Sequence, residues 1–371
     1  MDQPASPLLT HCPPTLPARA YSDPQWFAQE QRTIWARQWV YVGRIADLAM
    51  GTMRPVTVAN ASIILCHDNS GTIRAFHNSC RHRGAEICAA ERPMGKLISC
   101  PYHAWTYATD GRLVSTAFAT PTADFRREDH GLVPVSLRVW NGCIFLNLAS
   151  DPPDLNPDPG QDALDSWPMD SLRTGHRLVK DIACNWKVFW ENYNECLHCP
   201  GIHPELSDRV PVYAKGVMSV AESADIKATN GLTPGARSWT MTGAACGPEF
   251  PGLTAGQRVA GHLFTTVYPS MFIVAHVDYV RCVSLTATGP ETTRLTAEWL
   301  FSPETLAQPG FDAAEVARFA TLVMLQDATA CEMNQRGIRS PSYLNGTLMP
   351  QEFDLYAFHE WVLKQMDMGI S

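Results

Sequence analysis

The chain has 371 residues, of which 45% are hydrophobic and 18% charged, and its formal net charge is −8. A chain of this length exceeds the size at which one core usually stops growing, so we expect two domains. The sequence has no apolar run of about 18 residues that could cross a bilayer. Its acidic balance argues against nucleic-acid binding, which needs clustered Lys and Arg. We therefore expect a cytoplasmic protein whose partners are small molecules or other proteins.

Residues 1–39 are predicted to form an N-terminal arm and a helix that packs on the second domain. The first 24 residues contain six prolines and lack a basic start before an apolar block, so they are expected to be a loose arm rather than a signal peptide. From Asp23 to about Val40, apolar residues recur at helical spacing. Without export, the 12 cysteines are expected to bind metal or lie buried rather than to form disulfides.

Residues 40–150 are predicted to form a small all-β domain. The runs PVTVANASIILCH, TIRAFHNSC, AWTYATDGRL and RVWNGCIFLNL are short and punctuated by turn residues such as Asp-Gly. Such runs are typical of β-hairpins.

Residues 151–371 are predicted to form a second domain of mixed type. It begins with a Pro- and Asp-rich connection, and NWKVFWENYNECLH follows with a helical pattern. Strands are predicted at HLFTTVYPSMFIVAHV, DYVRCVSLTATG and TTRLTAEWLFS, and a long helix from Phe311 to about Gln335. The pattern favours an α+β fold in which an antiparallel sheet grips a helix.

Two Cys-His pairs lie within the predicted β domain. Cys80 and His82 form a CxH pair, and after seventeen residues Cys100 and His103 form a CxxH pair. Two Cys and two His can bind zinc or an iron-sulfur cluster, so the ligand count alone does not decide. Because each pair contributes one Cys and one His, the spacing favours a [2Fe-2S] cluster with one iron on two thiolates and the other on two imidazoles. Cys88 lies between the pairs and is interpreted as a buried thiol.

The segments CRHRGA and CPYHAWTY around these pairs resemble the Rieske domain. This resemblance implies a cluster whose imidazole ligands raise its reduction potential. The alternatives are a zinc site or a Rieske-type electron carrier without catalytic activity.

A second candidate metal site lies in ENYNECLHCPGIHPEL. His198 and His203 are five residues apart, too far round one continuous helix to bind the same ion easily. Pro200 and Gly201 are predicted to end the helix after His198 and to let His203 approach from a loop. Two imidazoles and one carboxylate form the facial triad of non-haem Fe(II) oxygenases.

Asp327, in VMLQDATACEMNQRGIRS, is the preferred carboxylate, and Glu332 is the alternative. This segment resembles the one that supplies the third iron ligand in the α-subunits of Rieske non-haem iron oxygenases. The resemblance extends from about Trp26 to the last helix. It implies a Rieske cluster, a mononuclear Fe(II), O2 as co-substrate and a head-to-tail homotrimer.

Glu195 precedes His198 by three residues, so the two side chains would share one face of a helix. In the family, a carboxylate at this place connects the iron-binding histidine to a Rieske histidine of a neighbouring subunit. A Glu here resembles the branch that acts on carnitine, choline and betaine. Cys196 and Cys199 also have a zinc or redox spacing, but no further soft ligand is evident, and both are interpreted as packing residues.

The sequence has no GxGxxG turn for NAD or flavin and no ferredoxin-type Cys cluster, so a separate flavin or iron-sulfur reductase or a ferredoxin must transfer electrons from NAD(P)H. The favoured activity is monooxygenation or N-demethylation of a small quaternary ammonium compound, and the alternative is ring hydroxylation of an aromatic acid. A quaternary ammonium is recognised by aromatic faces. The candidate pocket residues, each also compatible with a plain core position, are Tyr193, Phe264, Tyr268, Phe272 and Tyr279.

Overall fold

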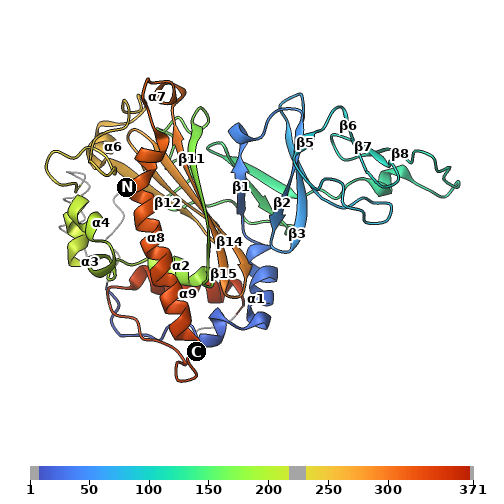
Figure 1. Cartoon of the computed structure of the whole chain (residues 1–371). Coiled ribbons are helices and arrows are strands. Elements are labelled where there is room, and N and C mark those ends of the chain that lie inside the picture. Colours follow the sequence, from blue (N-terminus) through green and yellow to red (C-terminus); the bar gives the residue numbers. More distant parts are fainter. Residues whose placement is uncertain (1–7, 217–230, 368–371) are drawn as a thin grey trace. The chain divides into compact units, whose positions relative to one another are not determined.

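The computed structural model describes residues 8–216 and 231–367 (Figure 1). The chain divides into two compact units, which are described separately below. The small unit is Trp35–Leu155, and the large unit is Met1–Ile34 with Asn156–Ser371.

The small unit consists of three antiparallel sheets with the orders β1-β10-β9, β4-β3-β2-β5 and β6-β7-β8. Its core combines aliphatic side chains with buried cysteines, among them Cys88. The strands are β1 Val40–Arg44, β2 Thr52–Val58, β3 Ala61–His67, β4 Ile73–His77, β5 Arg92–Pro93, β6 Leu97–Ser99, β7 Thr106–Ala108, β8 Leu113–Ser115, β9 Ser136–Trp140 and β10 Cys143–Asn147. Short 3-10 turns occur at Ile45–Asp47 and Arg127–His130.

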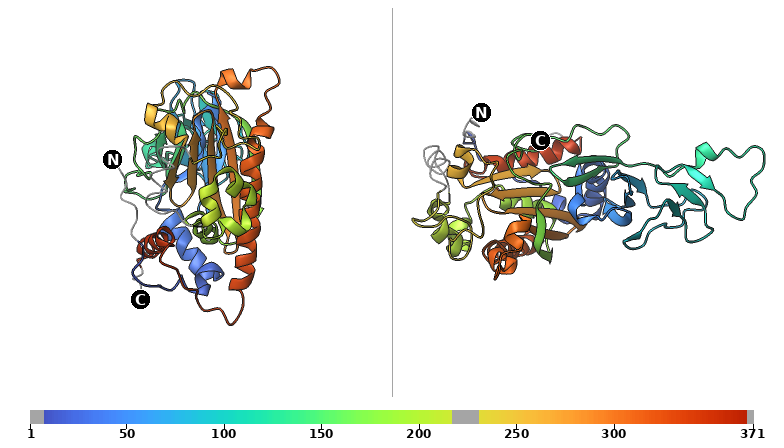
Figure 2. Two further views of the ribbon diagram at one scale, coloured as in Figure 1. Left: turned by 90° about the vertical axis from the view of Figure 1, so that its left-hand side faces the viewer. Right: turned by 90° about the horizontal axis from the view of Figure 1, so that it is seen from above.

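The large unit contains one antiparallel sheet of order β11-β15-β14-β13-β12 (Figure 2). β13 and the first half of β14 are buried on both faces, as their nearly continuous apolar sequences predict. The strands are β11 Arg173–Ile182, β12 His262–Val267, β13 Met271–His276, β14 Val280–Gly289 and β15 Thr292–Phe301.

The long helix α8 packs against α2 and β11. Asp312 caps α8 through a hydrogen bond from the backbone N–H of Ala314. None of the helices in the described residues has the length and apolar composition needed to cross a bilayer. The helices are α1 Pro24–Glu30, α2 Trp186–Tyr193, α3 Cys199–Ile202, α4 Pro204–Arg209, α6 Ala255–Ala260, α7 Pro303–Leu306, α8 Ala313–Ile338 and α9 Phe353–Gln365, with 3-10 turns at Ala18–Tyr21 and Pro211–Lys215.

Buried polar contacts fix α2, the helix that precedes the candidate iron site. Lys187 pairs with Glu30 of α1 at 2.5 Å, and both side chains are fully buried. Glu30 also accepts a hydrogen bond from the indole of Trp186 at 2.8 Å. One turn further along α2, Glu191 accepts a hydrogen bond from Tyr21 at 2.7 Å and pairs with His359 of α9 at 2.8 Å. A buried charge that is paired and hydrogen-bonded resists rearrangement, because breaking the pair leaves an uncompensated charge.

The predicted fold class, a small all-β domain with an α+β helix-grip domain, is confirmed. Two predicted elements differ from the structure. The N-terminal helix ends at Glu30, and a π-helical turn follows at Gln31–Trp35. The chain cannot continue as a helix to Val40, because Val40 pairs with Leu146 in a sheet. β11 was not predicted, because most of its side chains are charged or polar and no apolar run marks it. Along the strand, exposed residues alternate with half-buried ones.

Candidate metal centres

In the small unit, the rings of His82 and His103 lie side by side, and the thiols of Cys80 and Cys100 interact with each other. Both thiols are buried, whereas His82 is exposed and His103 half-buried. The two imidazole rings lie 4.7 Å apart, centroid to centroid. A pair of inward sulfurs and a pair of outward imidazoles is the donor set of a Rieske cluster, in which each iron has its own ligand pair.

Tyr107 lies beside the sulfur end of this group. Its hydroxyl is 3.2 Å from Sγ of Cys80, and it accepts a hydrogen bond from the backbone N–H of Arg81 at 3.0 Å. Burial raises the pKa of the Cys80 thiol, and the neighbouring thiol of Cys100 raises it further. A metal must therefore displace protons from these thiols, and a hydroxyl donor at the sulfur stabilises the thiolate.

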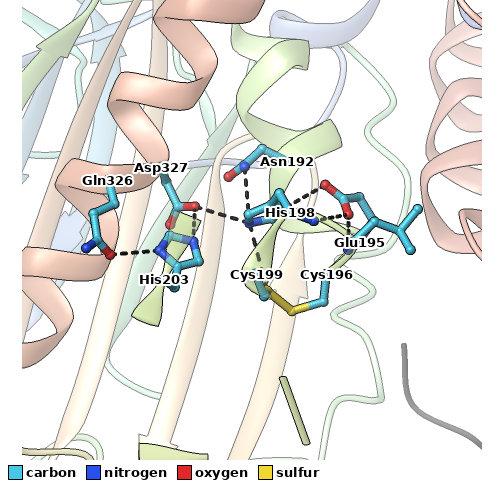
Figure 3. The surroundings of a disulfide bond; sticks show 9 residues. Asn192, Glu195, Cys196, His198, Cys199, His203, Gln326 and Asp327 are labelled. Atoms are coloured by element: carbon cyan, nitrogen blue, oxygen red, sulfur yellow. Dashed lines mark hydrogen bonds and ion pairs between the residues drawn. A yellow bond between two sulfur atoms is a disulfide. The ribbon is translucent and has the colours of Figure 1, made fainter. Parts of the chain in front are cut away.

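In the large unit, His198, His203 and Asp327 form one compact group (Figure 3). One ligand atom from each residue lies within 4.8 Å of the others. Nε2 of His203 is 2.9 Å from Oδ1 of Asp327, and Nε2 of His198 is 3.5 Å from the same oxygen. Two neutral imidazoles and a carboxylate converging on one point fit a mononuclear Fe(II) site.

The charges in this group depend on one another. Burial lowers the pKa of His198, but the carboxylates of Asp327 and Glu195 outweigh burial and raise it to about 9. Burial raises the pKa of Asp327, but the two imidazoles outweigh it and lower the pKa. His198 therefore holds a proton at neutral pH that a bound cation would replace.

Hydrogen bonds behind the group orient His203. Its Nδ1 is 2.8 Å from Oε1 of Gln326, and the amide nitrogen of Gln326 donates to Glu205 at 2.9 Å. Because the amide nitrogen is engaged by Glu205, the amide oxygen faces His203, whose Nδ1 must carry the proton. This tautomer leaves Nε2 free to bind a metal.

Glu195 lies at His198, but the two residues are not on a continuous helix as predicted. α2 ends at Tyr193, and His198 stands at the start of α3. The carboxylate of Glu195 folds back over the connecting turn: Oε1 is 2.6 Å from Nδ1 of His198, and Oε2 accepts from the backbone N–H of Leu197.

The prediction that Pro200 and Gly201 end the helix is also wrong. They lie inside the short helix α3, since proline is tolerated in a first turn, where its missing N–H would have no partner. α3 itself separates the two histidines. His198 precedes it and His203 follows it, so the rings meet with centroids 5.2 Å apart.

Cys196 and Cys199 form a disulfide, which corrects the interpretation of both as packing thiols (Figure 3). The backbone N–H of Cys199 bonds to the carbonyl of Cys196 at 3.1 Å, and this turn brings the two Cα atoms to 5.0 Å. That separation allows a disulfide. The covalent ring includes His198, so the backbone of a candidate iron ligand is held within it.

The remaining candidates are distributed over several environments. Glu332 accepts from the backbone N–H of Ala183 at 3.2 Å, and Asp327 rather than Glu332 lies beside the histidines. The rings of Tyr193 and Phe272 pack on each other with centroids 4.2 Å apart and planes tilted by 33°. Tyr268 lies apart from them, between α2 and α9, where its hydroxyl donates to Asn194 at 3.1 Å.

Phe264 and Tyr279 belong to a second aromatic group around Trp239, which the sequence did not single out. The ring of Phe264 is 6.4 Å from that of Trp239, and the hydroxyl of Tyr279 donates to the carbonyl of Trp239 at 3.1 Å. Gln326, Glu205 and Asn192, whose amide is 3.3 Å from Nε2 of His198, were also missed. The sequence signal for all three is that each lies close to a predicted ligand. Gln326 is next to Asp327, and the other two lie within six residues of a histidine ligand.

The fold and these two groups define the class of Rieske non-haem iron oxygenases. Residues 169–368 match the family described as the ring hydroxylating alpha subunit (catalytic domain), and residues 38–126 match the Rieske [2Fe-2S] domain. The chain belongs to the family of ring-hydroxylating oxygenase alpha subunits. It is an oxidoreductase whose cofactors are a Rieske [2Fe-2S] cluster and a mononuclear iron, with O2 as co-substrate.

Several relatives share most of the chain. It is 31% identical to the glycine betaine monooxygenase oxygenase subunit of Chromohalobacter salexigens, over 94% of this chain and 84% of that protein. Choline monooxygenase of Atriplex hortensis is 24% identical over 94% of this chain and 77% of its own. The carnitine monooxygenase oxygenase subunit of Escherichia coli K12 is 34% identical over 53% of this chain and 54% of its own.

Solved structures of the class have the same fold. The quaternary ammonium Rieske monooxygenase CntA matches with a TM-score of 0.70 at 19% identity, over 95% of both chains. Naphthalene 1,2-dioxygenase from Rhodococcus sp. matches with a TM-score of 0.66 at 19% identity, over 95% of this chain and 94% of its own.

Proposed function

We propose that this chain is the terminal oxygenase component of a multi-component system that hydroxylates a C–H bond next to the nitrogen of a small quaternary ammonium compound of the betaine type. The observation that carries the proposal is the convergence of His198, His203 and Asp327 within 4.8 Å. The names of the relatives, which act on glycine betaine, carnitine and choline, support the substrate class.

The mononuclear iron would be held by Nε2 of His198, Nε2 of His203 and the carboxylate of Asp327. Cys80, His82, Cys100 and His103 would hold the Rieske cluster. With three protein ligands, such an iron supplies open positions at which O2 is reduced next to the substrate. Hydroxylation of an N-methyl group consumes O2, two electrons and two protons, and releases water. The N-hydroxymethyl product loses formaldehyde, so the net reaction is N-demethylation.

Glu195 is proposed as a positioning and bridging residue. One carboxylate oxygen holds Nδ1 of His198 at 2.6 Å, which keeps Nε2 directed at Asp327. The carboxylate is 13% exposed. In a head-to-tail homotrimer, which we propose as the assembly, it would accept a hydrogen bond from a Rieske histidine of the next subunit. A separate reductase or ferredoxin would supply the electrons.

The aromatic groups are proposed to bind the cationic end of the substrate. The proposed residues are Tyr193 and Phe272, which pack on each other, and Phe264 and Tyr279 of the group around Trp239. A quaternary ammonium lacks N–H donors and so depends on aromatic faces. Burial raises the pKa of the Tyr193 hydroxyl. The hydroxyl therefore stays neutral, and the ring remains available as an uncharged face. Tyr268, which packs between α2 and α9, is left out of this assignment.

The test combines metal analysis with turnover. The purified protein should hold about three iron atoms per chain, two in the cluster and one in the facial triad. With a reductase and NADH, glycine betaine, carnitine, choline and benzoate are compared for O2 uptake and formaldehyde release. Formaldehyde from the methylated amines alone supports the proposal. Oxygen uptake driven by benzoate without formaldehyde would replace it with ring hydroxylation, and about two iron atoms per chain would make the protein an electron carrier.

A further inference from the structure

Arg281 of β14 is a buried cation that pairs with none of the residues the structure describes. Arg281 is 8% exposed, and its Nε has no hydrogen-bond partner among the described residues. Within residues 8–216 and 231–367, no hydrogen bond or ion pair satisfies its guanidinium group. A buried charge of this kind is costly unless an anion binds it.

The strand register places Arg281 on the face of the sheet that meets α2. Arg281 lies directly opposite Val274 of β13, and Phe272 is two residues from Val274 on the same face. The ring of Phe272 packs on Tyr193 of α2. The side chain of Arg281 therefore extends from the same sheet face as the aromatic pair.

The charges around Arg281 agree with this position. Burial lowers the pKa of its guanidinium, and the carboxylate of Asp327 partly offsets that effect. Asp327 is already occupied by His203 and His198. Arg281 is thus close enough to the proposed iron group to affect its charges, but it is not neutralised by it.

Two histidines on the neighbouring strands share this face of the sheet with Arg281. Burial lowers the pKa of His262 to about 4 and that of His276 well below its usual value. Both imidazoles are neutral at pH 7. One fixed positive charge next to neutral aromatic rings matches a single carboxylate, whereas a phosphate dianion would keep an unmatched charge.

We infer that Arg281 binds the carboxylate of the substrate, and that the substrate is therefore a zwitterion with its quaternary nitrogen among the aromatic rings. The quaternary nitrogen in this statement rests on the proposed function. A guanidinium can hold a carboxylate with two parallel hydrogen bonds, which a hydroxyl cannot replace. The residue thereby selects betaines over choline, which has the same trimethylammonium group but no carboxylate.

The experiment compares Arg281→Gln with wild type in the iron-loaded full chain. Calorimetric titration gives Kd for glycine betaine and choline, and steady-state assays give kcat and KM. Arg281→Gln should raise Kd and KM for glycine betaine by about 100-fold and change those for choline less than about threefold, because only the former loses a charged hydrogen-bond partner. Arg294→Gln is the matched control: Arg294 lies on the neighbouring strand β15, but it is exposed and pairs with Asp181.

Unchanged binding of glycine betaine by Arg281→Gln, or an equal loss for both ligands, overturns the inference. If Arg281→Gln does not retain iron, Arg281→Lys is used, which keeps the charge but not the planar pair of donors. An intermediate Kd for glycine betaine then supports the inference. If neither variant retains iron, the wild-type titrations decide: tighter binding of glycine betaine supports the inference, and choline bound as tightly as glycine betaine overturns it.

The same variants separate this inference from the proposed function. If no methylated amine yields formaldehyde, but benzoate binds to wild type and not to Arg281→Gln, the carboxylate site stands and the proposed function fails. If glycine betaine is demethylated with the same KM by both proteins, the function stands and the role of Arg281 fails.

Discussion

Gln326 and Asp327, adjacent residues of α8, contact the two nitrogens of the same imidazole. Oε1 of Gln326 is 2.8 Å from Nδ1 of His203, and Oδ1 of Asp327 is 2.9 Å from its Nε2. His203 is 1% exposed, so its ring has little freedom beyond these two contacts. One helix turn therefore supplies both the proposed carboxylate ligand and the group that sets the tautomer of a histidine ligand.

Replacing Gln326 by Leu should weaken iron binding without removing any ligand. The change deletes the acceptor at Nδ1 of His203, so the ring loses both its orientation and its preferred tautomer. Loss of such a partner typically lowers metal affinity about 10- to 100-fold. The iron dissociation constant of the mononuclear site, measured by chelator competition, checks this.

Thr329→Ala on the same helix is the control for this measurement. Its hydroxyl donates to the carbonyl of Leu325 in the preceding turn of α8. Equal iron affinity in Gln326→Leu and Thr329→Ala would contradict the proposed orienting role.

Asp327→Asn and Glu332→Gln should give opposite results. The first removes the carboxylate beside both histidines, and iron should fall from about three to about two atoms per chain while the Rieske absorption remains. The second removes an acceptor for the backbone N–H of Ala183 and should leave the iron content unchanged. Loss of the mononuclear iron in Glu332→Gln alone would reverse the assignment of the two acids.

The sequence could predict those parts of the site that chemistry restricts to few residue types. The CxH and CxxH pairs and the two histidines around Pro200 are such patterns, and the structure brings His82 beside His103 and His198 beside His203. The fold class was predictable for a similar reason, since alternating short runs followed by one long amphipathic stretch fit few architectures.

The parts that could not be predicted depend on contacts between distant residues. Arg281 shares a face with Phe272 only because β13 and β14 pair in one register. Gln326 and Glu205 are more than a hundred residues apart in the chain, and nothing in the sequence connects them. The prediction for Cys196 and Cys199 was wrong for another reason. A reducing environment was inferred for all cysteines of the chain, whereas a tight local turn brings these two together.

Iron uptake by the metal-free protein should improve as the pH rises. The carboxylates of Asp327 and Glu195 outweigh burial and raise the pKa of His198 to about 9, whereas an imidazole in the unfolded chain titrates near pH 6.5. The proton on His198 therefore stabilises the metal-free fold below about pH 6.5, and this contribution is lost as the pH rises through about 9. Iron must displace that proton, so its affinity should rise roughly tenfold per pH unit in this window.

Glu195→Gln provides the comparison for the pH experiment. It removes one of the two carboxylates that hold the proton on His198, so the pH dependence should move to lower pH. Titration of Co(II) into both proteins from pH 6.5 to 8.5 measures the shift. A flat profile in wild type would show that His198 is already neutral before the metal binds.

Tyr107→Phe should make the Rieske cluster harder to reduce. The hydroxyl of Tyr107 lies 3.2 Å from Sγ of Cys80, and a donor at a cluster sulfur stabilises the more negative, reduced state. A hydrogen bond worth about 1 kcal/mol corresponds to about 40 mV for one electron, so the midpoint potential should fall by roughly this amount. EPR-monitored redox titration measures it, with Tyr102→Phe as control because Tyr102 is exposed at the second loop. An unchanged potential in Tyr107→Phe would mean that this hydroxyl donates elsewhere once the cluster is bound.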